Sequence, residues 1–267
     1  MSETVLVTGA AGQIGAHLRR SLARPGRRLR LLDVVEMTPR DDEADYVTAS
    51  FLDESALDVA MTEVDAVIHL GGLSTGGYSW ADYANVNITG TQMIFDAARR
   101  HEVSRVVYAS SHHVMGRARI DAAHPLGEYE APQPDSYYAV SKVAGEALAR
   151  LYSERHGMDV VCVRIGSYRE RPSDQRTLWN WLSPSDCTRL FEAALQSPAP
   201  GFRIVWGVSR NTTRVVSLDE GTAIGFHPLD DAEVYRDSVS PAPYDLDPEQ
   251  SSLLGGAYTA VHFDQVN

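Results

Sequence analysis

The stretch Thr-Gly-Ala-Ala-Gly-Gln-Ile-Gly at residues 8–15 decides the fold of this chain. It follows an apolar run at 4–8 and opens a segment with helical spacing at 13–23. One glycine suits a sharp turn, another lets the backbone approach a pyrophosphate, and a third lets the helix pack close to the sheet. The helix N-terminus then faces the phosphates with free N–H groups. The residues that we expect at the cofactor are Gly9, Gly12, Gln13, Ile14 and Gly15.

Short apolar runs alternate with longer helix-spaced segments over the first two thirds of the chain. The runs predict strands at 4–8, 29–33, 46–49, 66–70, 105–110 and 160–165. Helices are predicted at 13–23, 54–62, 83–101 and 138–155. Nearly all-apolar strands separated by helices indicate a parallel sheet covered on both faces. The predicted class is a doubly wound, Rossmann-like α/β fold.

The pattern changes after Gly166. We expect an exposed loop at 169–174, a helix at 185–196, a strand at 202–206 and irregular chain at 241–248. The prediction is one Rossmann-like domain over 1–267. Within it, residues 1–165 form the dinucleotide-binding and catalytic core, and residues 166–267 form a small, mainly substrate-binding part.

Charge and composition exclude several classes of protein. The chain has 24 Lys and Arg against 36 Asp and Glu, which gives a net charge of −12 and disfavours nucleic acid and membranes as partners. The two cysteines, Cys162 and Cys187, cannot build a disulfide framework or a zinc cluster, and we expect no metal site. No apolar run approaches the roughly 20 residues of a membrane span. An apolar strand takes the place of a signal peptide, so we expect a cytoplasmic protein.

Asp33 ends the second predicted strand, 33 − 15 = 18 residues beyond Gly15. A carboxylate at this position can accept hydrogen bonds from both ribose hydroxyls of adenosine, and it repels a 2′-phosphate. The expected cofactor is therefore NAD rather than NADP.

Tyr138 and Lys142 lie four residues apart on a predicted helix, so their side chains share one face. The pKa of a free tyrosine is about 10. A nearby ammonium and a cationic nicotinamide both favour the phenolate, so we expect the pKa of Tyr138 to be lowered. Ser111 ends a strand at the carboxyl edge of the sheet, where ligands bind in such folds. Its hydroxyl is a candidate to hold the reacting oxygen.

Together these residues resemble the extended, sugar-nucleotide-epimerase-like branch of the short-chain dehydrogenase/reductase superfamily, over roughly residues 4–167. Stretches 69–72 (His-Leu-Gly-Gly) and 86–91 (Val-Asn-Ile-Thr-Gly-Thr) add to the resemblance. It implies Tyr138 as general base, Lys142 on the nicotinamide ribose, Ser111 on the reacting oxygen and Asn87 at the proton-relay end of the site. The other positions that it places at the cofactor are Leu70, Gly71, Gly72 and Ile165. Ser50 and Phe51 stand where the family has an acidic and then an aliphatic residue against adenine, which departs from the pattern.

A further set of residues is similar to the hexuronate-oxidising group of bacterial enzymes within that branch. The set comprises Arg176 and the stretches 71–72, 110–113, 164–167, 179–183 and 205–207. The similarity implies NAD-dependent oxidation of free hexuronic acids, such as D-galacturonate and D-glucuronate, at C1. Arg176 would grip the substrate carboxylate, for which a planar guanidinium is suited. The implied contacts to the rest of the sugar are Ser74, Ser111, His112, His113, Tyr138 and Ser167.

Two other functions stay open. A sugar-nucleotide epimerase or dehydratase of the same branch needs a larger C-terminal lobe than the 267 − 165 = 102 residues that follow Ile165. A non-catalytic NAD-sensing protein would be expected to lack Tyr138, Lys142 or Ser111, and all three are present. The fold resemblance also suggests a homo-oligomer, paired through the helices predicted at 83–101 and 138–155.

Overall fold

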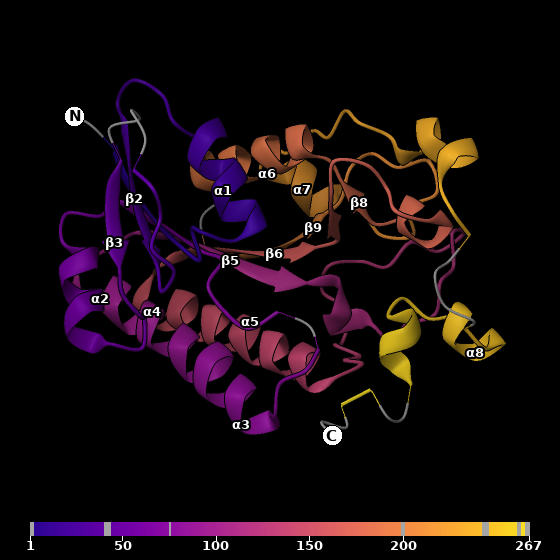
Figure 1. The fold of residues 1–267 in the computed structure, drawn as a ribbon, viewed down its shortest axis with the longest axis horizontal. Coiled ribbons are helices and arrows are strands. Elements are labelled where there is room, and N and C mark those ends of the chain that lie inside the picture. Colours follow the sequence, from indigo (N-terminus) through magenta and orange to yellow (C-terminus); the bar gives the residue numbers. More distant parts are fainter. Residues whose placement is uncertain are drawn as a thin grey trace.

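The computed structural model describes residues 3–39, 44–74, 76–198, 201–241, 246–260 and 263–264. Over these residues the chain builds a seven-stranded sheet in the order β3-β2-β1-β4-β5-β6-β9, with each strand pair parallel (Figure 1). The strands are β1 (Glu3–Thr8), β2 (Arg27–Asp33), β3 (Asp45–Thr48), β4 (Ala66–His69), β5 (Arg105–Ser111), β6 (Asp159–Ile165) and β9 (Phe202–Gly207). The strand order reverses between β1 and β4, which is where doubly wound folds bind ligands. The predicted fold class is confirmed.

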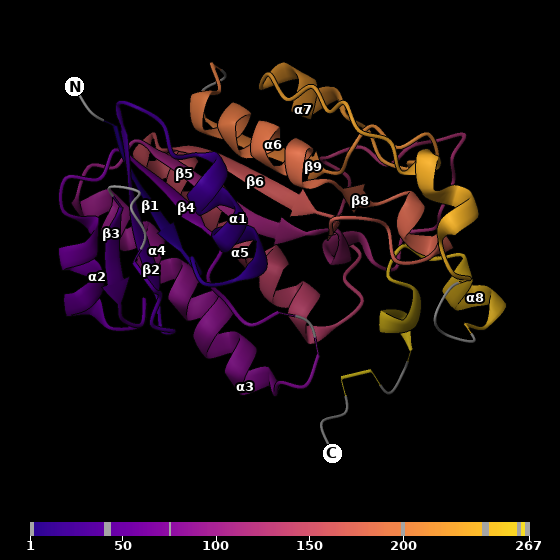
Figure 2. The same ribbon diagram turned by 45° about the horizontal axis from the view of Figure 1, so that its top comes forward.

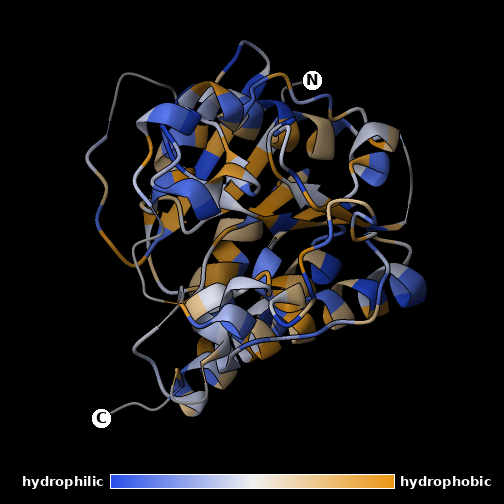
Figure 3. Ribbon diagram, turned by 90° about the vertical axis from the view of Figure 1, so that its right-hand side faces the viewer, coloured by the Kyte–Doolittle hydropathy of each residue, from blue (hydrophilic) through white to orange (hydrophobic). Residues whose placement is uncertain are grey.

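Helices cover both faces of the sheet (Figure 2). One layer holds α1 (Gln13–Ser21), α6 (Pro184–Gln196) and α7 (Asp219–Ala223), and the other holds α2 (Glu54–Met61), α4 (Gly90–Arg100) and α5 (Tyr137–His156). Side chains alternate along β1, so that Val5 and Val7 pack in the first layer and Leu6 packs in the second. Figure 3 shows the resulting hydrophobic strands at the centre, between the two helix layers.

The helix predicted at 83–101 is longer than expected and is not uniform. It begins with a short α3 (Trp80–Asp82), which Ser79 caps, and continues through a π-helical segment η1 (Tyr83–Thr89) into α4. Widened helical turns of this kind are frequent at functional sites. The π segment contains Asn87, one of the predicted site residues.

The C-terminal part packs onto the carboxyl edge of the sheet. It contains β7 (Ser167–Tyr168), η3 (Gln175–Leu178), β8 (Trp181–Leu182), η4 (Ala232–Ser238), α8 (Pro248–Ser251) and η5 (Gly256–Thr259). Val114, in the short η2 (His112–Met115), shares an apolar cluster with Trp206 and Leu254. This part of the chain therefore contributes to the core as well as to the surface.

Two expectations for this part can be compared with the structure. Most of the loop at 169–174 is exposed, as predicted, and in it only Pro172 and Asp174 are buried. The Asp174 side chain caps η3. In the predicted irregular stretch 241–248, residues 242–245 lie outside the described residues, and α8 begins at Pro248. Among the described residues, every helix is too short or too polar to cross a bilayer.

Candidate active site

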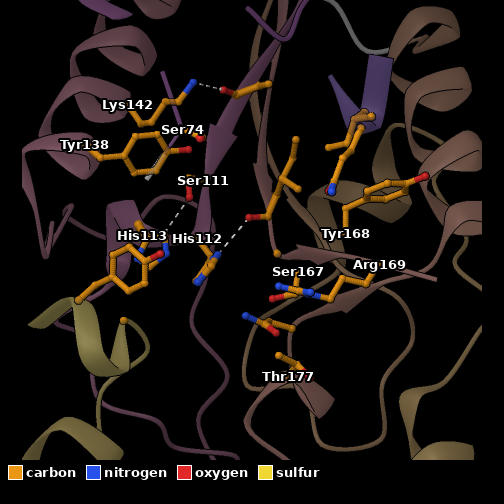
Figure 4. A pocket seen from close by; sticks show the side chains of 18 of the residues that line it. Ser74, Ser111, His112, His113, Tyr138, Lys142, Ser167, Tyr168, Arg169 and Thr177 are labelled. Carbon is orange, nitrogen blue, oxygen red and sulfur yellow. Dashed lines mark hydrogen bonds between the residues drawn. The ribbon is translucent and has the colours of Figure 1, made fainter. Parts of the chain in front are cut away.

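A cavity of about 1060 Å³ opens at the carboxyl edge of the sheet, between the glycine turn after β1 and the C-terminal part. Figure 4 shows Ser111, Tyr138 and Lys142 on one side of it, with Ser167 and Thr177 on the other. The predicted residues that line it are Gly9, Gly12, Gln13, Ile14, Gly15, Leu70, Gly72, Ser74, Ser111, His112, His113, Tyr138, Lys142, Ile165, Ser167 and Arg176. The predicted residues that do not line it are Asp33, Ser50, Phe51, Gly71 and Asn87.

The glycine turn leaves room that any side chain would fill. Gly9 has a φ of +70°, and a Cβ there would lie 2.7 Å from the backbone nitrogen of Gly71. A Cβ on Gly15 would lie 2.5 Å from the Gly9 carbonyl oxygen. Gly12 precedes α1 without a side chain to cap it, and the first turn of α1 has no acidic residue. The open N-terminus of α1 is thus suited to a phosphate group.

Asp33 lies beside this turn at the end of β2. Its Oδ2 accepts the backbone N–H of Ala11 at 2.9 Å, and its Oδ1 accepts that of Val35 at 3.0 Å. Each carboxylate oxygen keeps acceptor capacity, since an ionised carboxylate has about four lone-pair sites. The carboxylate is held in place and can still accept hydrogen bonds from hydroxyl groups.

Phe51 is a core residue rather than a wall of the cavity. Its ring fills the space that side chains on Gly71 and Gly90 would need, with Cβ positions 2.7 and 2.3 Å from ring atoms. The ring is 9% exposed and packs edge-on against His69. Ser50 accepts the backbone N–H of Leu52. The structure therefore does not bring Phe51 to the cavity, because the apolar ring is buried behind the loop.

Three predicted catalytic side chains converge in the cavity. Ser136 caps α5, so that Tyr138 lies in the first helical turn and Lys142 one turn later. Lys142 Nζ donates to the Ala109 carbonyl at 2.9 Å and lies 5.7 Å from the centre of the Tyr138 ring. The Ser111 hydroxyl hydrogen-bonds to Tyr138 and accepts the backbone N–H of His113 at 3.2 Å.

The electrostatics of this group differ from the sequence-based expectation. Burial raises the pKa of Tyr138 to about 12, and the hydrogen bond from Ser111 opposes that shift. Burial also lowers the pKa of Lys142 to about 8. The predicted lowering of the Tyr138 pKa is wrong for the protein by itself, because loss of water around the phenol outweighs the distant ammonium.

Asn87 braces the loop after β4. Its Nδ2 donates to the Leu73 carbonyl and to Ser141 Oγ, both at 3.0 Å, and its Oδ1 accepts the Leu73 N–H at 2.7 Å. The side chain is 2% exposed and lies next to Gly72, on the Lys142 side. The structure thus gives Asn87 a set of positioning contacts behind the cavity wall.

Two adjacent histidines line the cavity, and each has one ring nitrogen engaged. His112 Nδ1 lies 3.2 Å from the Ile165 carbonyl, and burial lowers the pKa of His112 well below its usual value. A neutral ring that donates from Nδ1 has an acceptor at Nε2. His113 Nδ1 lies 2.6 Å from Oδ2 of Asp135.

Arg176 joins the cavity to the C-terminal segment. Its Nη2 donates to the carbonyls of Leu253, at 2.8 Å, and Leu254. A Cβ on Gly256 would lie 2.4 Å from Arg176 Cζ, so the guanidinium occupies the space beside that glycine. Within the described residues, Nε and Nη1 have no hydrogen-bond partner and remain available to a ligand. Burial lowers the pKa of Arg176, while Asp174 and Asp135 favour its charged form.

In the described part of the chain, no three His, Cys, Asp or Glu side chains gather to hold a metal ion. Cys162 and Cys187 are both buried, in the sheet and in α6. The polar groups of the residues that line the cavity are hydroxyl, imidazole, amide, ammonium and guanidinium groups and the Asp174 carboxylate, which suit a polar organic ligand.

Comparison with known proteins identifies the family. Residues 5–169 match the NAD dependent epimerase/dehydratase family. The chain belongs to this family.

Relatives extend the similarity over nearly the full chain. The uronate dehydrogenase of Pseudomonas syringae pv. tomato is 38% identical over 96% of this chain and 93% of its own. The L-arabinose 1-dehydrogenase (NAD(P)(+)) of Haloferax volcanii is 34% identical over 85% of this chain and 97% of its own. The crystal structure of uronate dehydrogenase from Agrobacterium tumefaciens has a TM-score of 0.89 at 34% identity and covers 97% of both chains.

Several residues in or directly behind the cavity wall of this epimerase/dehydratase family member escaped the sequence analysis. Asp135 and Tyr258 contact His113, and Asn180 lines the cavity with its Oδ1 buried and without a partner among the described residues. No spacing rule connects residues so far apart. For Asp135, its place directly before the helix-capping Ser136 was a signal that its side chain lies at the start of α5.

Proposed function

We propose that this protein is an NAD-dependent dehydrogenase that oxidises hexuronic acids, such as D-galacturonate and D-glucuronate, at C1 to aldarolactones. The observation that carries the proposal is the convergence of Tyr138, Ser111 and Lys142 in one cavity that also holds the Arg176 guanidinium. The relatives named uronate dehydrogenase, at 38% and 37% identity over 96% of this chain, support it.

The turn after β1 fits NAD. Gly9, Gly12 and Gly15 form a cradle without side chains at the N-terminus of α1, and we assign the pyrophosphate to it. We assign the adenosine ribose to Asp33 and the nicotinamide ribose to Lys142. The remaining assigned contacts are Gln13, Ile14, Leu70, Gly71, Gly72 and Ile165. When bound, NAD supplies the nicotinamide that accepts the hydride from C1.

Tyr138 is assigned as the general base that takes the proton of the C1 hydroxyl. Its pKa of about 12 keeps it protonated at neutral pH in the protein by itself, so the phenolate needs stabilisation. The groups of this chain that supply it are the Ser111 hydroxyl, through its hydrogen bond, and the Lys142 ammonium, through its charge. Ser111 also orients the reacting oxygen, and Asn87 keeps the loop beside Lys142 in place as the relay end of the site.

The substrate contacts come from both halves of one domain, residues 1–165 and 166–267. Arg176 is assigned to the carboxylate, which its positive charge attracts. Nε and Nη1 lie on different edges of the guanidinium, so each offers the ligand single hydrogen bonds, while Nη2 holds the Leu253 and Leu254 carbonyls. The sugar hydroxyls are assigned to Ser74, Ser111, His112, His113 and Ser167. We also propose a cytoplasmic homo-oligomer paired through α4 and α5, which light scattering of the purified protein would test.

A panel of free sugars and sugar acids with NAD and NADP tests the proposal, with NADH absorbance as the readout. We expect NADH with galacturonate and glucuronate, and little with NADP because of the Asp33 carboxylate. A sugar-nucleotide epimerase would give no net NADH. No NADH with any hexuronate would refute the proposed activity.

Arg176→Ala tests the carboxylate contact. We expect kcat/KM for galacturonate to fall by about 30-fold or more, since loss of one partner of a desolvated charge pair costs about 2 kcal/mol or more. Turnover of galactose, which lacks the carboxylate, should change little. Arg176→Lys is the matched control for charge, because it keeps a positive charge but replaces the planar guanidinium by an ammonium group. An equal loss for both sugars in Arg176→Ala would contradict the assignment.

A further inference from the structure

Asp135 is a buried carboxylate behind His113, and the proposed mechanism gives it no role. Its side chain is 0% exposed, and its Oδ2 lies 2.6 Å from His113 Nδ1. Its Oδ1 accepts a hydrogen bond from Ser136 Oγ at 2.8 Å. A carboxylate that is removed from water needs such partners, because its desolvation is costly. The two hydrogen bonds fix Asp135 between η2 and the start of α5.

Two glycines shape the slot that holds this carboxylate. A Cβ on Gly116 would lie 1.8 Å from Asp135 Oδ2, and a Cβ on Gly255 would lie 2.1 Å from the same atom. Gly116 follows η2, and Gly255 belongs to the C-terminal segment. The chain therefore approaches the carboxylate closely from two sides and leaves its oxygen no space in which to turn away from His113.

The His113 ring is also fixed in place, by contacts with two neighbouring rings. Its centre lies 4.1 Å from that of His112 and 4.2 Å from that of Tyr258. The ring lines the cavity, and the His113 backbone N–H donates to Ser111 Oγ at 3.2 Å. The position of His113 is thus linked to the serine that hydrogen-bonds to Tyr138.

We propose that Asp135 is a positioning residue. Its Oδ2 accepts a hydrogen bond from the Nδ1–H of His113, which leaves Nε2 as an acceptor for a substrate hydroxyl. In a neutral imidazole one nitrogen donates and the other accepts, and the hydrogen bond at one nitrogen decides the state of the other. This inference rests on the proposed function only in making the ligand a sugar. The tautomer itself is a property of the protein alone.

Asp135→Asn tests the proposal with almost no change of volume. The amide can turn its NH₂ toward His113 and force the ring proton to Nε2. We expect kcat/KM for galacturonate to fall by about 10- to 100-fold, by analogy with the loss of the carboxylate that orients a metal-bound histidine. NAD affinity should not change.

The matched control is Asp186→Asn, at another buried carboxylate. Asp186 accepts the backbone N–H groups of Leu229 and Asp230, and it does not line the cavity. We expect this variant to lose stability and to keep the kcat/KM of the wild type. If Asp135→Asn lowered kcat/KM no more than Asp186→Asn, the positioning role would be wrong.

A double-mutant cycle separates positioning from a purely structural role. In a His113→Gln background, which has no imidazole to orient, the addition of Asp135→Asn should leave kcat/KM unchanged. If Asp135→Asn lowered kcat/KM as much in that background as in the wild type, the proposal would be overturned, because Asp135 would then act without His113.

Nitrogen-15 NMR of the imidazoles reads the tautomer without any substrate. The His113 signal, identified by its loss in His113→Gln, should report a protonated Nδ1 in the wild type and a protonated Nε2 in Asp135→Asn. The same signal in both proteins would overturn the inference. If the His113 tautomer changes between the two proteins as expected but the wild type makes no NADH from uronates, the proposed function is overturned and the role of Asp135 stands.

Discussion

Tyr138 is the residue on which the proposed chemistry depends most. Tyr138→Phe removes the phenol oxygen and leaves the ring in place, so the packing near Tyr83 and His113 stays. We expect kcat to fall by about 100- to 10,000-fold, the usual contribution of a positioned proton acceptor. Isothermal titration should give wild-type NAD affinity. A variant with the wild-type kcat would contradict the assignment of the base.

The lowered pKa of Lys142 predicts how the free energy of unfolding of the NAD-free protein depends on pH. Its pKa falls from 10.5 to about 8 in the fold. Between these values the unfolded state binds more protons, so the free energy of unfolding rises with pH. At 1.36 kcal/mol per unit the difference is about 3 kcal/mol. In urea titrations, the free energy of unfolding of Lys142→Met minus that of the wild type should therefore fall by about this amount from pH 8 to pH 10.5. A difference that stays constant over this pH range would contradict the lowered pKa of Lys142.

Residues close in sequence were the predictable part of the site. The four-residue step from Tyr138 to Lys142 and the glycine spacing at 9, 12 and 15 follow from helix and turn geometry. The sign of the Tyr138 pKa shift was not predictable, because desolvation depends on how tightly distant segments pack. Contacts such as Arg176 with Leu253, 77 residues apart, depend on the tertiary fold and have no local signal.

The turn and α1 act together as one element at the cofactor site. In Gly15→Ala the new Cβ would lie 2.5 Å from Gly9 O and 2.6 Å from Ala10 Cα, which are backbone atoms that must shift. We expect NAD affinity to fall by about tenfold or more, because each 1.4 kcal/mol of strain or lost contact is tenfold. Fluorescence titration with NAD measures it.

Gly127→Ala is the control for this element. Gly127 has no positive φ, and its Cβ would have ordinary contact with Glu130 at 3.7 Å. It does not line the cavity, so NAD affinity should stay at the wild-type value. Equal affinities for the Gly15 and Gly127 variants would show that close approach at the turn does not matter for binding.

The strand order, unlike the fold class, was beyond the reach of the sequence alone. Apolar runs marked the strands because both faces of a parallel sheet are buried. The sequence did not predict that Tyr83–Thr89 is π-helical rather than α-helical, since this segment lies within a longer helix-spaced stretch. The packing of Phe51 against Gly71 and Gly90 could not be predicted either, because only its aligned position suggested a role for it.

The whole molecule shares its core across both halves. One apolar cluster joins Val5 in β1 to Phe226 near the C-terminal part, and another joins Val114 to Leu254. We expect a single heat-induced transition in calorimetry, with equal calorimetric and van't Hoff enthalpies. NAD at a hundred times its Kd should add about 2.7 kcal/mol to the free energy of unfolding. NADP at the same concentration should add less, and two separate transitions would contradict the single-domain organisation.

The grip of Arg176 on the Leu253 and Leu254 carbonyls has a consequence for synthesis on the ribosome. Domains emerge from the N-terminus, so the glycine turn and β1 to β6 are translated well before residues 253 and 254. A nascent chain halted before residue 246 would lack both the carbonyls that hold this guanidinium and the Leu254 side chain, which packs with Val114 and Trp206 in the core. We therefore expect premature stop codons late in the message to abolish dinucleotide retention and sugar turnover together, because the shared core is then incomplete.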